Sequence, residues 1–312
     1  MRPVSSESPV WALLVVVALA AGCSPDDAET TSTPAGTTSV PVVTTTTLAV
    51  TTTSESISTT TSADPTLPGD LLVVGDWGTG TLPQGAVAGA MSLYAEDNEV
   101  AAILTTGDNF LSDDAGFLMQ PYGWAVDADI PFWVTWGDRD LESEARVEDI
   151  EETFGAPPRW SVHEWGAVDV VILDSTQIES EEQSAFLVET LESSEDPTIV
   201  VVHHPPYSCG ADGDTEGVKE RWLGMFDEDV FLVLSGHEPA YQRFEDPTVT
   251  YVVTGGGGEQ LIEIAECTAG GPGLVAGTST HHFLVLEQSD GISVSALDVN
   301  GQAIDRFTLG LP

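Results

Sequence analysis

Aspartate and histidine side chains stand at the ends of strand-like segments, where they could hold a metal ion. Asp76, Asp108 and Asp138 each follow a glycine at the end of an apolar run, and His203 and His237 end two later runs. Because ligands bind beyond the carboxyl ends of strands in open α/β sheets, these five side chains could converge on one rim. Their carboxylate and imidazole groups suit Zn, Mn or Fe, so the pattern predicts a metal site.

The stretch "FWVTWGDRDLE", from Phe132 to Glu142, is the most densely charged of these strand ends. Its apolar, aromatic half is typical of a buried strand, and the "GDRD" that follows places three charges together. If the stretch stood alone, a solvated turn would be the better explanation of these charges, because the ends of strands are commonly polar. The order of all five strand ends along the chain favours a functional site.

The elements that must position these residues alternate along the chain from Leu71 onward. Strand-like runs are separated by segments with helical spacing, such as residues 84–98 and residues 180–194, the second of which starts with an N-cap serine. The last segment, residues 281–309, alternates like antiparallel strands joined by glycine turns. This alternation predicts an α/β fold whose sheets are covered by helices.

Five sequence blocks occur in an order that resembles the calcineurin-like metallophosphoesterases, most closely their purple-acid-phosphatase-like branch. The blocks are "GDWG", "GDNFL", "GDRD", "VHHPPYS" and "GHEPAYQR", and they are followed by "YVVTGGGG" and "HHFLVLE". The resemblance covers about residues 70–309. It implies a four-layer αββα sandwich with a two-metal site that binds phosphate, and a small phosphate ester as the substrate.

By this resemblance, one metal ion would be held by a complete set of four side chains. They are Asp108, which bridges the two metals in the family, Asp138 in place of the family asparagine, His203 and His237. The ion expected there is Fe, Zn or Mn.

The second metal site of the family is depleted in this sequence. It would need Asp76, the bridging aspartate, a tyrosine and a second histidine, but the last two positions hold Leu111 and Pro239. Neither side chain offers a donor to a cation. The second site is therefore empty, weak, or completed by neighbours such as Asp113, Glu238 or water, and the sequence leaves one ion or two open.

Arg139 stands where the family has a histidine that contacts phosphate and assists the leaving group. A guanidinium with a pKa above about 12 can hold phosphate, but it cannot donate and recover a proton near neutrality. Arg139 and His204, a neighbour of the metal histidine expected to line the pocket, are the candidate catalytic residues. The alternative is that Arg139 pairs with Asp76 or Asp140 and fills the vacated site.

Several other motif residues have structural explanations. His281 and His282 open a strand and are expected to be packed or exposed rather than functional. Tyr241 and Arg243 follow the metal histidine at the family spacing, but a core ring and a buried ion pair explain them as well. The "TGGGG" run lacks the lysine and helix start of a phosphate-binding P-loop, so a tight turn is expected there.

The first 69 residues predict export and a tether. Arg2 precedes the apolar run "VWALLVVVALA", which is typical of a signal peptide over residues 1–22. The "LAAGC" that ends at Cys23 resembles the bacterial lipobox, in which the cysteine carries the lipid. Residues 23–69 are then the lipidated cysteine and a disordered Thr/Ser/Pro-rich stalk, and residues 70–312 form the metallophosphoesterase-like domain. This places the protein on the extracytoplasmic face of the cell membrane.

The composition limits the partners of the chain. With 51 acidic against 8 basic residues and a formal charge of −43, the chain would be repelled by nucleic acid. The acidity favours solubility instead. Of the three cysteines, Cys209 and Cys267 remain after Cys23 is assigned to the lipid, and an exported domain permits a disulfide between them without fixing its geometry. The sequence does not define the oligomeric state.

Two functions follow from these residues. The first is a lipid-anchored, extracytoplasmic phosphoesterase that acts on phosphomonoesters with one complete metal site. The second is a binding or scaffold protein that keeps the fold with impaired or lost catalysis, because donors are missing at Leu111 and Pro239 and Arg139 replaces a titratable histidine.

Overall fold

The computed structural model describes residues 68–312 except 227, 266 and 268–270, so the predicted signal peptide, Cys23 and most of the stalk lie outside the described residues. No helix in the described part is long and apolar enough to cross a membrane. Its helices are α1 (Leu82–Asp97), α2 (Ala115–Met119), α3 (Gly123–Asp127), α4 (Glu144–Phe154), α5 (Glu181–Ser193) and α6 (Glu216–Arg221). Its strands are β1 (Asp70–Val74), β2 (Val100–Thr105), β3 (Phe132–Trp133), β4 (Ser161–Trp165), β5 (Val168–Ile172), β6 (Thr198–Val201), β7 (Val230–Ser235), β8 (Tyr241–Glu245), β9 (Thr250–Thr254), β10 (Gly273–Thr278), β11 (His282–Gln288), β12 (Ile292–Asp298) and β13 (Ala303–Leu309).

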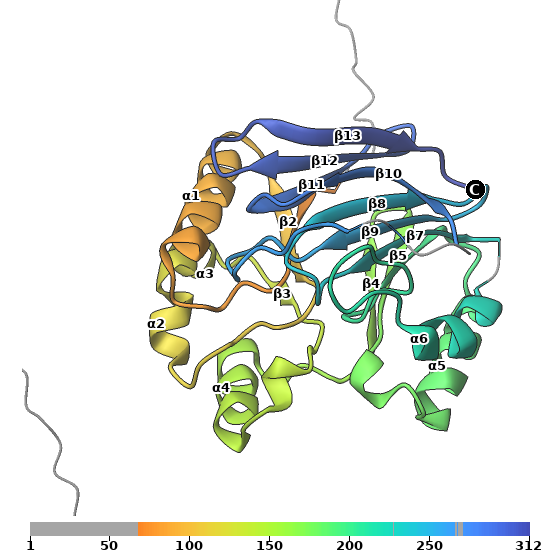
Figure 1. The fold of residues 1–312 in the computed structure, drawn as a ribbon, viewed down its shortest axis with the longest axis horizontal. Helices are drawn as coiled ribbons and strands as arrows, with labels where there is room; N and C mark the ends of the chain where they lie inside the picture. The colour runs from red at the N-terminus through yellow and green to blue at the C-terminus, as the bar shows by residue number, and fades with distance from the viewer. Residues whose placement is uncertain (1–67, 227, 266, 268–270) are drawn as a thin grey trace, which may run out of the picture. The chain divides into compact units, whose positions relative to one another are not determined.

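The strands form two mixed sheets that lie face to face between helices (Figure 1). One sheet has the order β13-β12-β11-β1-β2-β3, and the other has the order β10-β8-β9-β7-β6-β5-β4. Within the first sheet β1, β2 and β3 are parallel, and within the second β5, β6, β7 and β9 are parallel. The parallel strands lie at one end of the first sheet, where β3 is the edge strand, and in the middle of the second sheet, where antiparallel strands flank them.

Successive side chains of β1 point to opposite faces of its sheet, so the strand packs against two layers. Leu71 and Val73 are buried in the core between the two sheets, whereas Leu72 and Val74 pack on the other face against α1. The second sheet buries its outer face in the same way against α5. The α/β fold predicted from the sequence, a four-layer αββα sandwich, is confirmed.

The ends of the elements follow local signals, with one exception. The Ser180 hydroxyl caps α5, and α4 ends at Gly155 in the left-handed conformation with φ 76°. The exception is the aromatic run from Phe132 to Trp136, because only its first two residues belong to strand β3. The Thr135 N–H donates to the Thr105 hydroxyl at 3.1 Å instead of to a strand carbonyl, so the ladder stops before "GDRD".

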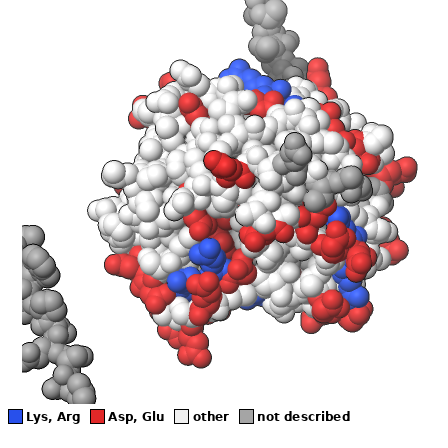
Figure 2. Space-filling view, viewed as in Figure 1, with Lys and Arg blue, Asp and Glu red and all other residues white. Residues whose placement is uncertain are grey.

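Acidic side chains dominate the charged surface. On the face shown in Figure 2 they gather over the lower half and the right edge, with several basic side chains among them, and a further basic group lies at the top edge. Arg146, for example, is paired with both Asp113 and Glu142.

Candidate metal centre

The five strand-end residues predicted from the sequence are brought to one edge of the molecule. Asp76, Asp108 and Asp138 follow the parallel strands β1, β2 and β3, and His203 and His237 follow β6 and β7 of the other sheet. Asp76, Asp108 and His237 have left-handed backbones, with φ of 54°, 51° and 69°. This conformation is costly for residues other than glycine and persists where the surroundings enforce it, commonly at functional sites.

One backbone contact between the sheets fixes the orientation of the His203 ring. Its Nδ1 lies 2.9 Å from the Thr106 carbonyl oxygen, which can only accept, so Nδ1 carries the hydrogen. Nε2 is left facing the strand ends, where a proton or a metal ion can bind to it. Metal-binding histidines are commonly oriented by such a bond from their other nitrogen.

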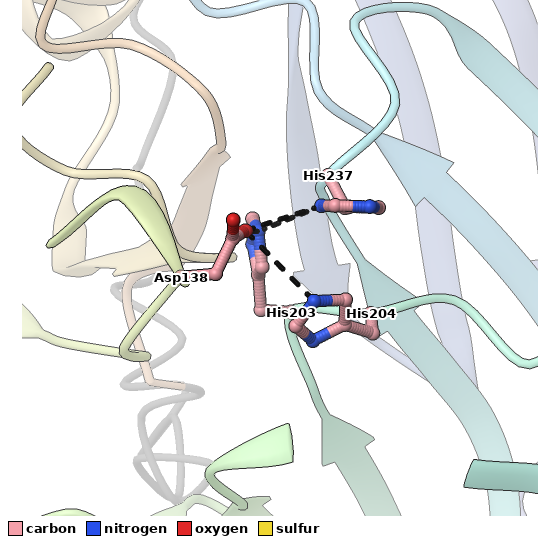
Figure 3. Close-up of side chains that lie close together, drawn as sticks. All are labelled: Asp138, His203, His204 and His237. Atoms are coloured by element: carbon pink, nitrogen blue, oxygen red, sulfur yellow. Dashed lines mark hydrogen bonds and ion pairs between the residues drawn. The ribbon is translucent and has the colours of Figure 1, made fainter. Parts of the chain in front are cut away.

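Ligand atoms of three neighbouring residues lie close to this Nε2, and Figure 3 draws two of these residues, Asp138 and His237, together with His203 and His204. The Asp138 Oδ1 atom lies 3.1 Å from Nε2 of His203 and 3.3 Å from Nδ1 of His237. The Asp108 Oδ1 atom lies 3.3 Å from the same Nε2, and the two histidine nitrogens are 3.2 Å apart. Mixed carboxylate and imidazole donors at this spacing fit a Zn, Fe or Mn ion.

The electrostatics of the cluster favour a positive charge at its centre. Burial alone would lower the pKa of His203, but the charges of Asp108 and Asp76 and the hydrogen bond with Asp138 raise that pKa to about 10. Hydrogen bonds from His203 and His237 hold the pKa of Asp138 well below its usual range. The site therefore attracts a cation, which a divalent ion or a proton can supply.

His204 borders this cluster in a different protonation state. Its Nε2 points toward Asp138 at 3.8 Å, and its Nδ1 lies 2.7 Å from the Ser175 hydroxyl (Figure 3). Burial and the neighbouring rings of His203 and His237 lower its pKa to about 3. His204 is therefore a neutral ring at the edge of the site, with one nitrogen directed toward the metal ligands.

Asp76 borders the side of the cluster where the family's second ion would lie. It forms a second group of potential ligands with Asp108 and His203. Its Oδ2 accepts the His237 N–H at 3.0 Å, while its Oδ1 is buried and has no hydrogen-bond partner among the described residues. Leu111 and Pro239 provide no side-chain donor, so this side is depleted of the family's ligands.

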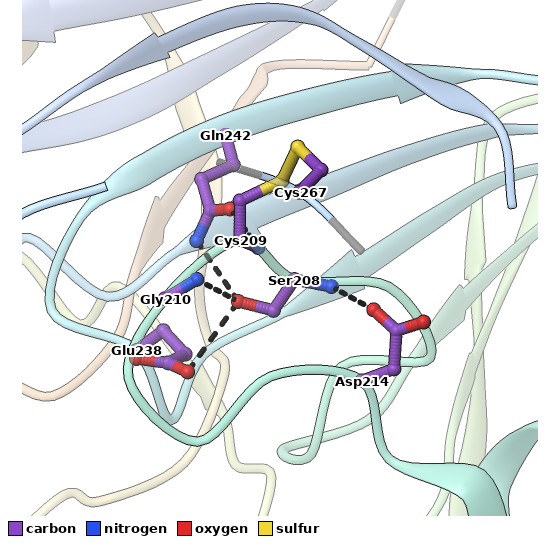
Figure 4. The surroundings of a disulfide bond; sticks show 7 residues. All are labelled: Ser208, Cys209, Gly210, Asp214, Glu238, Gln242 and Cys267. Atoms are coloured by element: carbon purple, nitrogen blue, oxygen red, sulfur yellow. Dashed lines mark hydrogen bonds between the residues drawn. A yellow bond between two sulfur atoms is a disulfide. The ribbon is translucent and has the colours of Figure 1, made fainter. Parts of the chain in front are cut away.

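Glu238, which was considered as a replacement ligand, is committed to a loop. Its carboxylate accepts N–H groups from Ala211, Asp212 and Gly213 at 3.2, 2.8 and 3.1 Å, and it also bonds Ser208 (Figure 4). The interpretation of Glu238 as a ligand is therefore wrong, because its oxygens serve backbone donors.

The other proposed replacement, Asp113, is also engaged elsewhere. Its carboxylate bonds the Ser143 hydroxyl and Arg146 at 3.0 and 3.2 Å, and its side chain is 56% exposed. This contact ties the segment after β2 to the start of α4. Asp113 is therefore not a second-site ligand in this structure.

The same region carries a disulfide between Cys209 and Cys267 (Figure 4). The Cys209 carbonyl also accepts the Ala265 N–H at 2.7 Å, and Ile262 donates its N–H to the Pro239 carbonyl at 3.1 Å. The disulfide and these two backbone hydrogen bonds join the loop around Cys209, which the Glu238 carboxylate holds, to the segment from Ile262 to Cys267, which follows the glycine run. These two segments on the border of the site are therefore held in contact with each other.

Arg139 does not pair with Asp76 or Asp140, in contrast to the alternative considered from the sequence. Its guanidinium contacts Glu259 at 3.3 Å and Glu142 at 3.9 Å, and its side chain is 43% exposed. It therefore lies at the rim of the site and does not fill the second metal position. Only its backbone N–H reaches the cluster, donating to Asp108 Oδ1 at 3.0 Å.

Asp140, the third charge of "GDRD", is structural. It is fully buried and accepts N–H groups from Asn109, Phe110 and Gly137 at 2.7, 3.0 and 2.8 Å, and it also accepts from the Asn109 amide. These bonds hold the loops after β2 and β3 together. Asp140 thereby positions Asp108 without contacting the donor cluster.

Sequence reasoning missed two acidic residues at the mouth of the site. Glu259 and Asp212 line a hollow of about 150 Å³ together with Asp108, Arg139 and His237. The Asp212 carboxylate reaches within 3.7 Å of His237 Nε2. The glycine run before Glu259 was interpreted only as a tight turn, and the acid that follows it was the available signal.

The remaining motif residues have the structural roles expected of them. His282 is buried between the Thr254 hydroxyl and the Thr280 carbonyl, and His281 lies beside a glycine carbonyl. Tyr241 and Arg243 both bond Asp305 of β13. These contacts hold β8 against the other sheet and do not reach the donor cluster.

Comparison with solved structures identifies the fold. GAP50, the anchor in the inner membrane complex of Plasmodium, is similar with a TM-score of 0.65 and 18% identity, over 79% of this chain and 90% of that one. The purple acid phosphatase PPD1 of yellow lupin seeds has a TM-score of 0.63 and 16% identity over 77% of this chain, which spans about half (53%) of the enzyme. A dimetal phosphatase from Danio rerio has a TM-score of 0.52 and 12% identity, over 80% of this chain and 100% of that chain.

At these identities the likeness shows the fold alone. No protein-family model matches the sequence, and no curated protein matches it. The chain therefore has the metallophosphoesterase fold, with a cluster of aspartate and histidine side chains at the edge where the parallel strands of both sheets end.

Proposed function

We propose that this protein is a metal-dependent phosphoesterase that hydrolyses phosphomonoesters on the outer face of the cell membrane. The observation that carries the proposal is the convergence of Asp108, Asp138 and His237 on His203, whose Nδ1–H is held by a backbone carbonyl. The phosphatases that share the fold support the same class of reaction. The export signal and the lipid on Cys23 rest on the sequence.

A bound divalent ion would supply a Lewis acid and an activated water for attack on phosphorus. Asp108, Asp138, His203 and His237 would hold that ion. Their own task is to fix its position and to balance its charge with two carboxylates.

Arg139 would bind the phosphate oxygens from the rim of the hollow. A guanidinium presents paired N–H donors to a phosphate, and this one lines the hollow with its side chain 43% exposed, although it is also paired with Glu259. It cannot protonate the leaving group. His204 is neutral because its pKa is lowered to about 3, so it can donate one N–H to the phosphate but is a weak general acid.

Because neither Arg139 nor His204 is an effective general acid, we expect a substrate preference. Esters whose leaving group needs no proton, such as aryl phosphates, should be hydrolysed faster than alkyl phosphates. The test is hydrolysis of p-nitrophenyl phosphate and an alkyl phosphate by the full chain with added Zn²⁺ or Mn²⁺. Equal rates for the two esters would contradict the assignment of Arg139 in place of an acid.

Arg139→Gln separates binding from a structural role. The loss of one charge-assisted contact should lower kcat/KM for p-nitrophenyl phosphate by about tenfold to a hundredfold. Arg221→Gln is the matched control, because Arg221 pairs with Glu181 on the surface. If both variants keep the wild-type kcat/KM, Arg139 does not bind the substrate.

The second candidate function is a binding or scaffold protein. It is favoured by the lost donors at Leu111 and Pro239 and by the likeness to Plasmodium GAP50, which is described as an anchor. A purified chain that holds its metal and releases no phosphate from any of the esters would support this function instead.

A further inference from the structure

The hollow beside the donor cluster has an acidic wall, and among its described lining residues Arg139 is the one arginine or lysine. Four acidic residues share this wall, namely Asp108, Asp212, Glu238 and Glu259. Asp108 belongs to the donor cluster, and the Glu238 carboxylate serves backbone donors of a loop. An ester bound in the hollow would therefore lie beside the carboxylates of Glu259 and Asp212, with Arg139 as its permanently positive neighbour.

The charge of Arg139 is already offset by Glu259. The Oε1 atom of Glu259 lies 3.3 Å from Nη2 of Arg139, and the Glu259 side chain is only 20% exposed. An ion pair that is partly shielded from water interacts more strongly than a fully exposed pair. The second acidic partner, Glu142, lies 3.9 Å from Nε, which is beyond hydrogen-bond distance. Since a guanidinium carries five N–H donors, Arg139 keeps donors for a phosphate although its charge is offset.

Backbone contacts hold Glu259 beside Arg139. The Glu259 N–H donates to the Asp76 carbonyl at 3.0 Å, and the Gly257 N–H donates to the Gly75 carbonyl at 2.9 Å. These two bonds attach the end of the glycine run to the end of β1, next to the donor cluster. The Glu259 carboxylate is therefore a fixed part of the wall, and a substrate has to bind beside it.

A second depression adjoins the hollow at Glu259 and offers an almost uncharged surface. It measures about 450 Å³, and it shares Glu259 and Gln260 with the hollow. Its other lining residues carry no carboxylate, lysine or arginine, and they are Thr81, Pro83, Gly258, Leu261 and His281. An uncharged organic group that extends from the phosphate past Glu259 would lie against these residues, whereas an anionic group would be placed next to the Glu259 carboxylate.

We propose that Glu259 is a specificity-determining residue, which competes with the anionic groups of a substrate for Arg139. The substrate phosphate uses the Arg139 N–H groups that Glu259 leaves free. A second anionic group on the same ester is repelled by Glu259 and Asp212, and it has no other arginine or lysine among the described lining residues. The site therefore accepts phosphomonoesters of uncharged alcohols and excludes those that carry a carboxylate or another phosphate. This inference rests on the proposed function, because it concerns the ester that the same site would hydrolyse.

Binding of two phosphonates to the full-length protein tests this inference without depending on hydrolysis. Phenylphosphonate and meta-carboxyphenylphosphonate carry the same phosphorus group on a C–P bond that resists hydrolysis, and they differ in one carboxylate. Isothermal titration calorimetry in the presence of Zn²⁺ or Mn²⁺ gives both dissociation constants. The wild type should bind phenylphosphonate at least about tenfold more tightly than the carboxylated compound.

Glu259→Gln keeps the size of the side chain and removes its charge. This variant should bind phenylphosphonate at least as tightly as the wild type does, and its two dissociation constants should differ by about twofold or less. Glu142→Gln is the matched control, because Glu142 lies near the same guanidinium, is 51% exposed and is not among the residues that line the hollow. The control should keep the wild-type discrimination, since water screens an exposed carboxylate.

Four results would overturn the role of Glu259. They are a wild type that binds both phosphonates equally, a wild type that binds neither, a Glu259→Gln variant that keeps the wild-type discrimination, and a Glu142→Gln variant that loses it. Hydrolysis of p-nitrophenyl phosphate, measured on the same samples, separates this inference from the proposed function. Discrimination that depends on Glu259 without hydrolysis would refute the phosphoesterase and keep the role of Glu259, whereas hydrolysis with equal binding of both phosphonates would do the reverse.

Discussion

Asp140→Asn should destabilise the fold although the substitution changes only one oxygen to an amide nitrogen. The Asp140 carboxylate accepts four hydrogen bonds, from the Asn109, Phe110 and Gly137 N–H groups and from the Asn109 side chain. Asparagine has one acceptor oxygen. If that oxygen keeps the two bonds at Oδ1, the new NH₂ group faces two other donors, and both of those bonds are lost.

The expected loss is large relative to the stability of a domain. Hydrogen bonds to charged groups contribute about 1.5 to 3 kcal/mol each, so two lost bonds cost about 3 to 6 kcal/mol. Removing a buried charge beside Asp108 offsets part of this cost, since burial and Asp108 raise the pKa of Asp140 to about 7. This rise of about 3 pKa units corresponds to about 4 kcal/mol at about pH 8.5, so the upper part of that range leaves a net loss of about 1 to 2 kcal/mol, against a typical total of about 5 to 15 kcal/mol.

Urea unfolding measures this loss, at about pH 8.5, where the wild-type carboxyl is ionised. Asp113→Asn is the control, because its carboxylate is largely exposed and its ion pair with Arg146 contributes little. The control should stay within about 0.5 kcal/mol of the wild type. A loss below about 1 kcal/mol for Asp140→Asn would refute the role of Asp140 as the acceptor that joins the two loops.

Three further outcomes are expected. Replacing both Cys209 and Cys267 with serine should lower the unfolding free energy by about 4 kcal/mol in urea, since the bridge closes a loop of 58 residues, and an unchanged midpoint would contradict this. Burial lowers the pKa of His282 to about 4 from an ordinary 6.5. The neutral ring's contribution to the free energy of unfolding is therefore complete above pH 6.5 and is lost as the pH falls through 4. When the pH falls from 6.5 to 4, the unfolding free energy of His282→Gln should therefore drop by about 3 kcal/mol less than that of the wild type. Parallel plots of unfolding free energy against pH would contradict this prediction. Cys23→Ala should move the protein from the membrane fraction to the soluble fraction. Continued membrane association of this variant would contradict the prediction that Cys23 carries the lipid anchor.

The strand-end ligands could be predicted because their signal is local. Asp76 and Asp108 each follow an apolar run and a glycine, and parallel strands bring such ends to one edge. The alternation of strands and helices was enough to predict the fold class. The short β3 could not be predicted, since it ends where Thr135 bonds a side chain of another strand.

The roles of the acidic residues around the site depend on tertiary contacts, and the sequence does not encode these locally. Glu238 directly follows a metal-ligand candidate, yet its carboxylate serves a loop that begins thirty residues earlier, at Ser208. Glu259 is remote from the other candidates in sequence and reaches the site through a backbone bond to Asp76. Arg139 pairs with Glu259 and not with the nearby Asp140, because the Asp140 carboxylate already accepts hydrogen bonds from backbone N–H groups.

The most direct measurement of the proposed function is metal-dependent hydrolysis of p-nitrophenyl phosphate by His203→Ala. His203 lies at the centre of the donor cluster, whereas the Nδ1 of His281, mutated to alanine as the control, lies 3.3 Å from the Gly256 carbonyl oxygen. The wild type and His281→Ala should hydrolyse the ester in a reaction abolished by chelation, and His203→Ala should lose its metal and at least about a hundredfold in rate. Wild-type hydrolysis by His203→Ala, or a fully metal-loaded wild type that releases no phosphate, would contradict the proposed function.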